Sequence, residues 1–377
     1  MSLEIRQGLA DIPPAAWDAL VGNGSAFLEW AWLASLEESG CVAPETGWQP
    51  HHITLWDGVQ LAGACPVYLK GHSQGEFVFD HSWAEAARRS GIRYYPKLLV
   101  GVPFTPATGA RFLTHPDSDR SRSIRIMAEA LMDMCRQTGL SSVHVNFCLP
   151  DEAKALGAIG FAPRVGYQFH WTNPGWLTFE DYLAAFRSKR RAQIKRERQE
   201  PAVQGVDITV HAGTDIANDL FDLMFRLYKT TIDKLYWGRQ YLNRRLFELL
   251  RQRWKHRLCF ILARRGRNII AGAFNVRKND VLWGRYWGAF EELRFLHFNV
   301  CYYAAIDYCL REGIGRFEPG AGGEFKRLRG FDARPTLSMH FVTDTRLASA
   351  VHTALRQERA AVAAELDWLN DHSPIRK

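Results

Sequence analysis

Apolar positions in the first half of the chain follow helical spacing in some segments and strand spacing in others. Residues 3–7 predict a short strand, Pro13-Pro14 opens a helix, and a second helix follows at 26–38. In residues 51–70, apolar and β-branched runs flank the dipeptide Asp57-Gly58. This arrangement predicts a β-hairpin that turns at the dipeptide.

The segment after the hairpin, at 72–116, is rich in aromatic residues and has no clear period, so we expect an irregular insertion there. An apolar stripe at helical spacing follows, and then the run SSVHVNF at 141–147, which predicts a strand. The stripe consists of Ile124, Met127, Leu131, Met134 and Cys135.

The second half repeats this plan. A helical stripe is followed by a second hairpin at 257–278, a strand at 281–290, a helix at 298–309 and a short strand after Gly315. The stripe consists of Leu220, Leu223, Met224 and Leu227. The second hairpin strands also match, with Ala-Gly-Ala at 62–64 and again at 271–273. We interpret the chain as a tandem duplication of an α/β unit.

Domain boundaries follow from this repeat. A length of 377 residues exceeds the size of one hydrophobic core. We expect an N-terminal domain at 1–165 and a second domain at 166–345, which contains a basic helix at 186–199. A C-terminal amphipathic helix fills 346–377.

Composition limits the class of protein. The chain carries 48 Lys and Arg against 40 Asp and Glu, a net charge of +8 that favours anionic partners. Its seven cysteines form no CxxC pair, which is typical of reduced thiols, and no apolar stretch is long enough to span a membrane. No export signal is recognisable, so we expect a cytoplasmic protein without a membrane span. Motifs of zinc sites, serine hydrolases and P-loops are absent, and no metal is expected.

The order of helices, antiparallel hairpin strands, long helix and strand resembles the Gcn5-related N-acetyltransferase (GNAT) fold, present twice. This resemblance implies an α/β (α+β) protein with two mixed, mainly antiparallel sheets flanked by helices. In that fold the central sheet splays between two strands, and the gap holds the acyl donor.

Several stretches are similar to the FemAB-like family of Gram-negative bacteria, whose members are often labelled peptidoglycan biosynthesis or N-acyltransferase proteins. They include the glycine-rich segment RFEPGAGGEFKRLRGF at 316–331 and six other stretches. Those six are YYPKLLVGVPFTPATGARFL (94–113), SSVHVNF, FHWTNPGWLTFEDYLAAFRSKRRAQIKRER (169–198), YWGRQYL (236–242), WGRYWG (283–288) and LHFNVCYYAAIDYC (296–309).

The resemblance implies an N-acyltransferase that moves an acyl or aminoacyl group to an amine of a small or peptidic acceptor, with aminoacyl-tRNA as the expected donor. An acyl-CoA-dependent N-acetyltransferase is the alternative. A non-catalytic ligand-binding member of the family is a second alternative, because the chain departs from the family pattern. Asn299 stands where the family has Glu, Gly322 where it has Gln, and Phe325 where it has His.

Acyl transfer needs a base for the amine, donors for the oxyanion and a proton source for the leaving group. Glu318 ends a predicted strand, where the splayed sheet would expose it. Glu324 and Lys326 follow glycines that let backbone approach a ligand. With Tyr286, these residues are our catalytic candidates. The alternative is a solvated loop in which the glycines only form turns.

Further side chains are candidates for substrate binding. Arg285 and Trp287 lie between two glycines and can pair with or stack on a planar or phosphorylated group. His297 and Asn299 lie near a helix start, and His170 lies at the junction of the halves. Core packing or structural linkage is the alternative for each of them. The remaining candidates, Trp237, Tyr303 and Arg329, lie in the segments that carry the resemblance.

The basic helix carries seven cations in twelve positions. We predict phosphate or nucleic-acid contacts for Lys189, Arg190, Arg191, Lys195 and Arg198, because Lys and Arg release counterions when they neutralise phosphates. A solvated helix face is the alternative. Since the run lacks an aromatic residue for stacking, it would read shape and charge.

Overall fold

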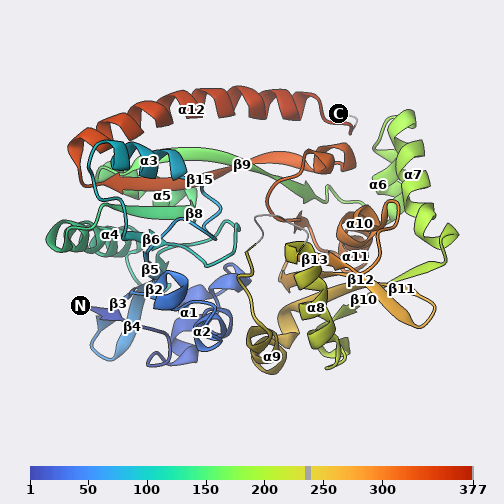
Figure 1. The fold of residues 1–377 in the computed structure, drawn as a ribbon, viewed down its shortest axis with the longest axis horizontal. Helices are drawn as coiled ribbons and strands as arrows, with labels where there is room; N and C mark the ends of the chain where they lie inside the picture. The colour runs from blue at the N-terminus through green and yellow to red at the C-terminus, as the bar shows by residue number, and fades with distance from the viewer. Residues whose placement is uncertain (234–238, 376–377) are drawn as a thin grey trace. The chain divides into compact units, whose positions relative to one another are not determined.

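The structure is a computed structural model that describes residues 1–233 and 239–375. The chain forms two compact units (Figure 1). Unit 1 comprises Met1–Tyr167 and Pro335–Ala364, and unit 2 comprises Gln168–Arg334 and Glu365–Lys377. Residues 335–345, which the sequence places in the second domain, therefore belong to unit 1. The chain passes between the units within β9 (Ala162–Thr172), β15 (Asp332–Val342) and α12 (Thr345–Asp371).

Unit 1 contains two sheets. The smaller has the strand order β1-β3-β4-β7, and the larger has the order β15-β8-β6-β5-β2 within the unit. The strands are β1 (Ser2–Arg6), β2 (Trp48–Pro50), β3 (His52–Asp57), β4 (Gln60–Cys65), β5 (Val67–Lys70), β6 (Lys97–Val100), β7 (Leu113–Thr114) and β8 (Ser142–Cys148). The helices are α1 (Pro14–Val21), α2 (Trp30–Glu38), α3 (His81–Arg89), α4 (Arg120–Thr138) and α5 (Pro150–Ala158).

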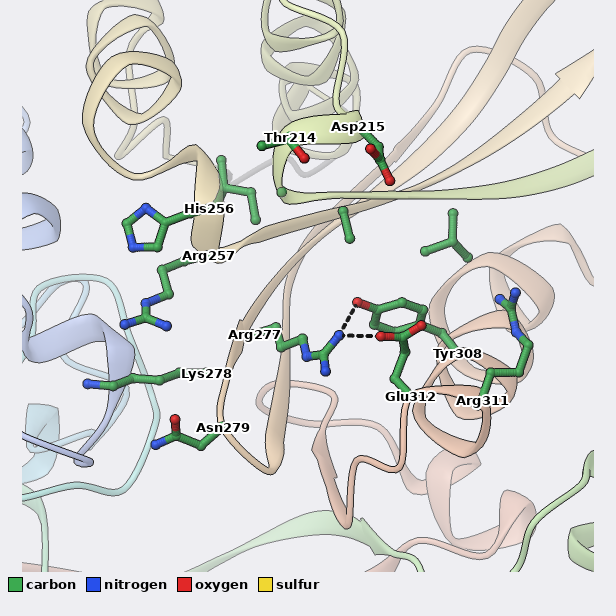
Figure 2. Close-up of a pocket in the computed structure, with 14 residues that line it drawn as sticks. Thr214, Asp215, His256, Arg257, Arg277, Lys278, Asn279, Tyr308, Arg311 and Glu312 are labelled. Carbon is green, nitrogen blue, oxygen red and sulfur yellow. Dashed lines mark hydrogen bonds and ion pairs between the residues drawn. The ribbon is translucent and has the colours of Figure 1, made fainter.

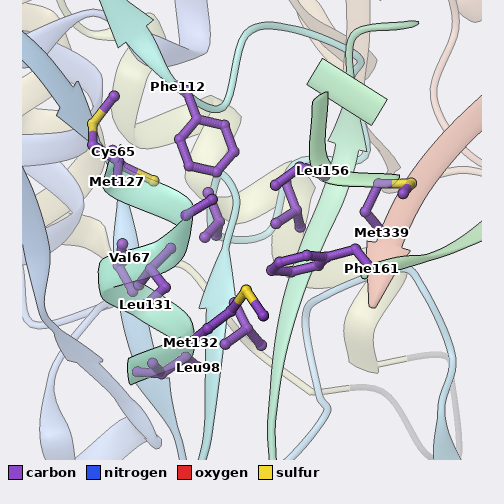
Figure 3. Packing of buried hydrophobic residues seen from close by; sticks show 14 of the residues in the cluster. Cys65, Val67, Leu98, Phe112, Met127, Leu131, Met132, Leu156, Phe161 and Met339 are labelled. Carbon is purple, nitrogen blue, oxygen red and sulfur yellow. The ribbon is translucent and has the colours of Figure 1, made fainter. Parts of the chain in front are cut away.

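Helix α4 covers one face of the larger sheet and forms the main core of unit 1 (Figure 3). The predicted stripe residues Ile124, Met127 and Leu131 are fully or almost fully buried there. Met339, from β15, packs in the same cluster. The core of the first unit therefore includes a residue from near the end of the chain.

The opposite face of this sheet carries buried charges. Lys70 and Lys97 lie directly opposite each other on β5 and β6, and both are fully buried. The Lys97 ammonium contacts Glu76 at 2.9 Å and also pairs with Asp80. Burial alone would lower the pKa of Lys97, but these two carboxylates raise it. Since a buried cation without partners is very unfavourable, the pairs hold the segment after β5 on the sheet.

Unit 2 contains one sheet with the order β10-β11-β12-β13-β14-β9. Its strands are β10 (Val206–Ala212), β11 (Leu258–Arg265), β12 (Asn268–Lys278), β13 (Val281–Ala289) and β14 (Arg316–Glu318). Its helices are α6 (Phe179–Ala184), α7 (Ser188–Val203), α8 (Leu220–Asp233), α9 (Arg244–Arg253), α10 (Leu296–Phe298) and α11 (Ala304–Arg311), with a π-helical turn at Asn299–Tyr303 between the last two.

Most predicted elements are present, including both hairpins, β3–β4 and β11–β12. The predicted irregular insertion at 72–116 is wrong in part, because it contains α3 and the central strand β6. β6 has only four residues, and a buried run that short has no measurable period. The predicted helix at 298–309 is interrupted by the π-helical turn, a feature often found at functional sites.

Candidate active site

The sheet of unit 2 opens between β13 and β14. The two strands pair in parallel over three residues, and the last pair is Trp283 with Glu318. β14 ends there, whereas β13 continues to Ala289. A β-bulge lies just beyond the last pair, because Phe274 faces Tyr286 and Asn275 faces Gly284, which leaves Arg285 as the extra residue. Bulges of this kind redirect side chains next to active sites.

Glu318 lies at this opening, and the predicted exposure of its side chain is wrong. The residue is only 5% exposed. Burial raises the pKa of Glu318 to about 6, although the Arg316 guanidinium, 3.0 Å away, and Trp283 lower it. A carboxyl group with such a pKa exchanges protons near neutral pH, as a general base must.

His170, a substrate-binding candidate from β9, lies beside Glu318. Its Nε2 lies 3.9 Å from the Glu318 Oε2, and neither atom has a hydrogen-bond partner among the described residues. Burial lowers the pKa of His170 to about 3, with further lowering by Arg316, Arg334 and Lys326. The imidazole is therefore neutral at physiological pH. The structure thus brings these two separately predicted candidates together across β9 and β14, which are neighbouring strands.

Lys326 shapes the glycine-rich loop that follows Glu318. Its ammonium donates hydrogen bonds to the carbonyl oxygens of Gly320 at 2.6 Å and Ala321 at 3.3 Å. Burial lowers the pKa of Lys326 to about 8. Gly320 has φ of +89°, a conformation that favours glycine. The loop is thus held by a lysine that can release a proton near neutral pH. The side chain of Glu324 lies outside the described part of the structure.

In the WGRYWG motif of β13, Tyr286 and Gly288 pack against helix α8. Tyr286 packs edge-on against Tyr228 of α8 and Phe274 of β12, with ring centroids 5.0 and 5.9 Å apart. The Arg285 guanidinium lies 5.3 Å from the Tyr286 ring. A Cβ on Gly288 would lie 1.8 Å from a backbone oxygen of α8, so only glycine fits there. Tyr286 therefore contributes to packing between sheet and helix.

His297 lies in an aromatic cluster. Its ring contacts Trp287 at 5.1 Å and Tyr302 at 5.3 Å between centroids. Burial lowers the pKa of His297 to about 4, and Arg329 and Lys326 lower it further. The structure thus brings Trp287 and His297 together, as a neutral imidazole against an indole.

A buried glutamate that sequence reasoning missed, Glu197 of α7, gathers three other candidates. Its carboxylate accepts hydrogen bonds from the Arg329 guanidinium at 2.6 Å and from the Tyr303 hydroxyl. The Asn299 amide donates to the Glu197 carbonyl oxygen at 2.7 Å. The Arg329 guanidinium also stacks on the Phe298 ring at 3.4 Å. This cluster fastens α7 to the π-helical turn.

The sequence contains a signal that indicates the burial of Glu197. It is an acid within a run of cations, and it follows Ile194 by three positions, so the two residues share one helix face. Both are buried, as is Pro201 four positions later. The cations of α7 therefore point mostly away from the core.

The five basic candidates of α7 divide into two groups. Arg198 is engaged, with its guanidinium 3.5 Å from the Phe179 ring and 3.4 Å from Asp307. Arg190 donates to Gln193 at 2.9 Å. Lys189 and Lys195 are exposed, and Arg191 is half-buried. Trp237 lies outside the described residues.

The sides of unit 2 also contain cavities. The larger of two cavities near α11 measures about 580 Å³ and is lined by residues of β10, β12 and α11. One of them, Arg277, donates hydrogen bonds to Tyr308 and Glu312 (Figure 2). A second, of about 530 Å³, adjoins it and is lined by Arg198, Asn299 and Tyr303, among others. Glu318, His170 and Lys326 line neither of them.

Among the described residues, no three His, Cys, Asp or Glu side chains gather as a metal site would require. Within residues 1–233 and 239–375, no helix combines the length and the apolar character of a membrane span.

The sequence of the chain matches one known protein family. Residues 8–377 match the FemAB-like family, described as peptidoglycan biosynthesis/recognition. The chain belongs to the FemAB-like family. The comparison with curated proteins finds no match.

Solved structures similar to this FemAB-like protein share its fold at low identity. FemX is 11% identical, with a TM-score of 0.54, and the match covers 93% of this chain and all of FemX. L-PGS from Bacillus licheniformis is 8% identical, with a TM-score of 0.56, covering 92% and 97% of the two chains. A domain of a candidate lysylphosphatidylglycerol synthetase from Agrobacterium fabrum is 13% identical, with a TM-score of 0.54, covering 90% and 94%. The expected fold, α/β with tandem GNAT-like domains, is confirmed.

Proposed function

We propose that this FemAB-like protein is an N-acyltransferase that moves an aminoacyl group from aminoacyl-tRNA to an amine of a small or peptidic acceptor. The observation that carries the proposal is Glu318, a buried carboxylate with a pKa of about 6 at the opening between β13 and β14. The family description, peptidoglycan biosynthesis/recognition, and the name lysylphosphatidylglycerol synthetase of a structural neighbour support aminoacyl transfer.

In the proposed reaction, the acceptor nitrogen attacks the ester carbonyl carbon, and the bond from that carbon to the ribose oxygen then breaks. Glu318 takes the proton that the nitrogen loses. His170 is a positioning residue that keeps a neutral imidazole beside this carboxylate. Lys326, with a pKa of about 8, supplies a proton to the leaving oxygen. Its hydrogen bonds to Gly320 and Ala321 also fix the loop at the opening.

The remaining candidates have supporting roles in this proposal. Arg285 and Trp287, on the part of β13 that extends beyond β14, are proposed to contact the donor. The Glu197 cluster, with Arg329, Tyr303 and Asn299, keeps α7 in position beside the π-helical turn. The exposed cations of α7 are proposed to contact phosphates of the donor tRNA.

The donor is tested by incubating the purified protein with candidate amines and either labelled aminoacyl-tRNA or labelled acetyl-CoA. We expect the label to move from tRNA and not from acetyl-CoA. Transfer from acetyl-CoA alone would replace the proposed donor by the alternative one, and no transfer from either donor would favour a ligand-binding protein.

The site is tested separately by Glu318→Gln, which we expect to lower turnover by about 10²–10⁴-fold. Glu248→Gln, on the exposed side of α9, is the matched control and should leave turnover unchanged. Equal turnover in Glu318→Gln and the native protein would remove Glu318 from the mechanism.

A further inference from the structure

The outer strand of the unit 2 sheet, β10, has one edge that pairs with no other strand of the described chain. It pairs with β11 over seven residues, and β11 is its only neighbour in the strand order of the described chain. Six of its seven residues are half-buried or exposed, and residues of α7 and α11 lie across the adjoining cavity. The cavity of about 530 Å³ lies beside the strand and is lined by five consecutive residues, 206–210. Consecutive residues line a cavity only where a strand presents its edge, because alternate side chains point to opposite faces.

The sequence of this strand, VDITVHA, is complementary to itself. If two copies pair antiparallel in the register that matches all seven residues, Thr209 lies opposite Thr209 on the two-fold axis. Asp207 then faces His211 of the second copy, twice, and Ile208 faces Val210, also twice. Thr–Thr, acid–base and β-branched pairs all stabilise antiparallel ladders.

The polar and apolar side chains of β10 lie on opposite faces of the sheet, as this pairing requires. Thr209 and His211 share one face of the sheet, since the Thr209 hydroxyl and the His211 Nε2 lie 3.0 Å apart. Ile208 and Val210 point to the other face. The pairing therefore places apolar residues against apolar residues on one face and polar against polar on the other.

Strand β1, another edge strand, provides a contrast. It pairs with β3, and its sequence is SLEIR. The register that matches all five residues of two copies places Glu4 directly opposite Glu4. Like charges in that position are destabilising, so the β1 edge disfavours its own copy.

We propose that β10 is a self-association edge through which two copies of this chain form a two-fold symmetric dimer with a continuous sheet. The symmetry is isologous, so one patch serves both copies. Seven paired residues provide less than the standard interface of about 1,600 Å². The dimer is therefore weak, with a dissociation constant on the order of 10–100 µM.

Sedimentation equilibrium over a concentration series tests this proposal. The native protein should pass from monomer to dimer in the range given above. Thr209→Lys and Thr209→Glu should each remain monomeric, because equal charges then meet on the axis. A 1:1 mixture of the two variants should dimerise again, because Lys then faces Glu. Circular dichroism spectra must match the native one, which shows that the variants are folded.

The restored association in the mixture is specific to a register centred on Thr209. Glu4→Lys, on the β1 edge, is the control and should leave the association of the native protein unchanged. A native protein that is monomeric up to about 1 mM, a Thr209→Lys variant that still dimerises, or a mixture that stays monomeric would each overturn the proposal.

Discussion

The burial of the Glu318 carboxyl group lowers the stability of the folded protein at neutral pH, but it also favours proton transfer by this residue. Its carboxyl group is buried beside a neutral imidazole, and Arg316 is the one cation that pairs with it among the described residues. The fold therefore disfavours the ionised form, which is the form that accepts a proton. Groups of this kind are typical of active sites, where the surroundings tune a pKa toward the working pH.

Activity and stability should depend on pH in opposite senses through this residue. Activity should fall as pH decreases through about 6, because protonated Glu318 cannot act as base. The folded state holds the proton more tightly than the unfolded chain, so the free energy of unfolding decreases as pH rises from about 4.5 through 6. A shift from 4.5 to about 6 corresponds to about 2 kcal/mol.

Glu318→Gln should therefore be more stable than the native protein by up to about 2 kcal/mol at pH 7.5 and equally stable near pH 4. Urea unfolding at both pH values measures this difference. A variant that is less stable than the native protein at pH 7.5 would contradict the burial argument. The loss of activity in a more stable variant would also exclude unfolding as its cause.

The buried residues of the candidate site differ in how well sequence predicts them. Glu318 could be located because a strand end followed by glycines is a local signal. The partner of Arg329 could not, since Glu197 lies more than a hundred positions away in the chain. The ion pairs of Lys97 with Glu76 and Asp80 in unit 1 were also not predicted, because these partners lie 21 and 17 positions away, beyond the reach of a local pattern. Only the fold brings such groups together.

At the scale of elements, α7 combines two opposite faces. Ile194 and Glu197 are buried against unit 2, whereas Lys189, Lys195 and Arg196 are exposed. This arrangement separates the anchoring of the helix from its charge. The exposed cations can therefore be replaced without loss of the anchor.

Replacement of Lys189, Lys195 and Arg196 by Gln should weaken RNA binding and flatten its dependence on salt. Each lost phosphate contact lowers the slope of log affinity against log salt by about 0.7–0.9. Filter binding of tRNA at several salt concentrations measures this. The control replaces Arg122, Arg125 and Lys154, three exposed cations of α4 and α5, with the same change in net charge. If the control lowers the slope equally, α7 has no special role.

Long helices with a clear apolar period were predicted well. Short strands, and strands that pair with distant segments, were not. α4 shows a clear stripe over 19 residues. β6 has four residues, and its place in the sheet depends on partners at 67–70 and 143–145. The strands β9 and β15 were not predicted, because each pairs with a strand more than a hundred positions away. Pairing over long sequence separations leaves no local pattern.

At the scale of the molecule, unit 1 completes its sheet with a strand from outside the block that the repeat suggests, whereas unit 2 uses residues of β9 from within its own block. β15 pairs with β8 of unit 1 along residues 337–342. β9 pairs with β14 of unit 2 at Trp171 and Thr172. Unit 1 also depends on α12, since Leu347, Val351 and Leu355 pack in one of its cores. A cut at the boundary that the sequence predicts would therefore leave unit 1 incomplete.

A fragment of residues 1–167 should not fold cooperatively, whereas the same fragment joined by a short linker to 335–364 should. The linker can be short because Gly166 lies against Thr336. The first fragment lacks β15, so the edge of β8 and part of the core are exposed. Thermal unfolding followed by circular dichroism compares the two. Equal cooperativity in both fragments would show that the returning strand is dispensable.

The returning strand also determines the order in which the protein can be completed on the ribosome. Residues 1–167 are synthesised first, but their sheet waits for residues 335–342, and unit 2 is made in between. Domains generally fold as units in the order of synthesis. Here the sheet begun by residues 1–167 is completed only after residues 168–334 have been made, and the nascent chain must protect the edge of β8 until residues 335–342 emerge.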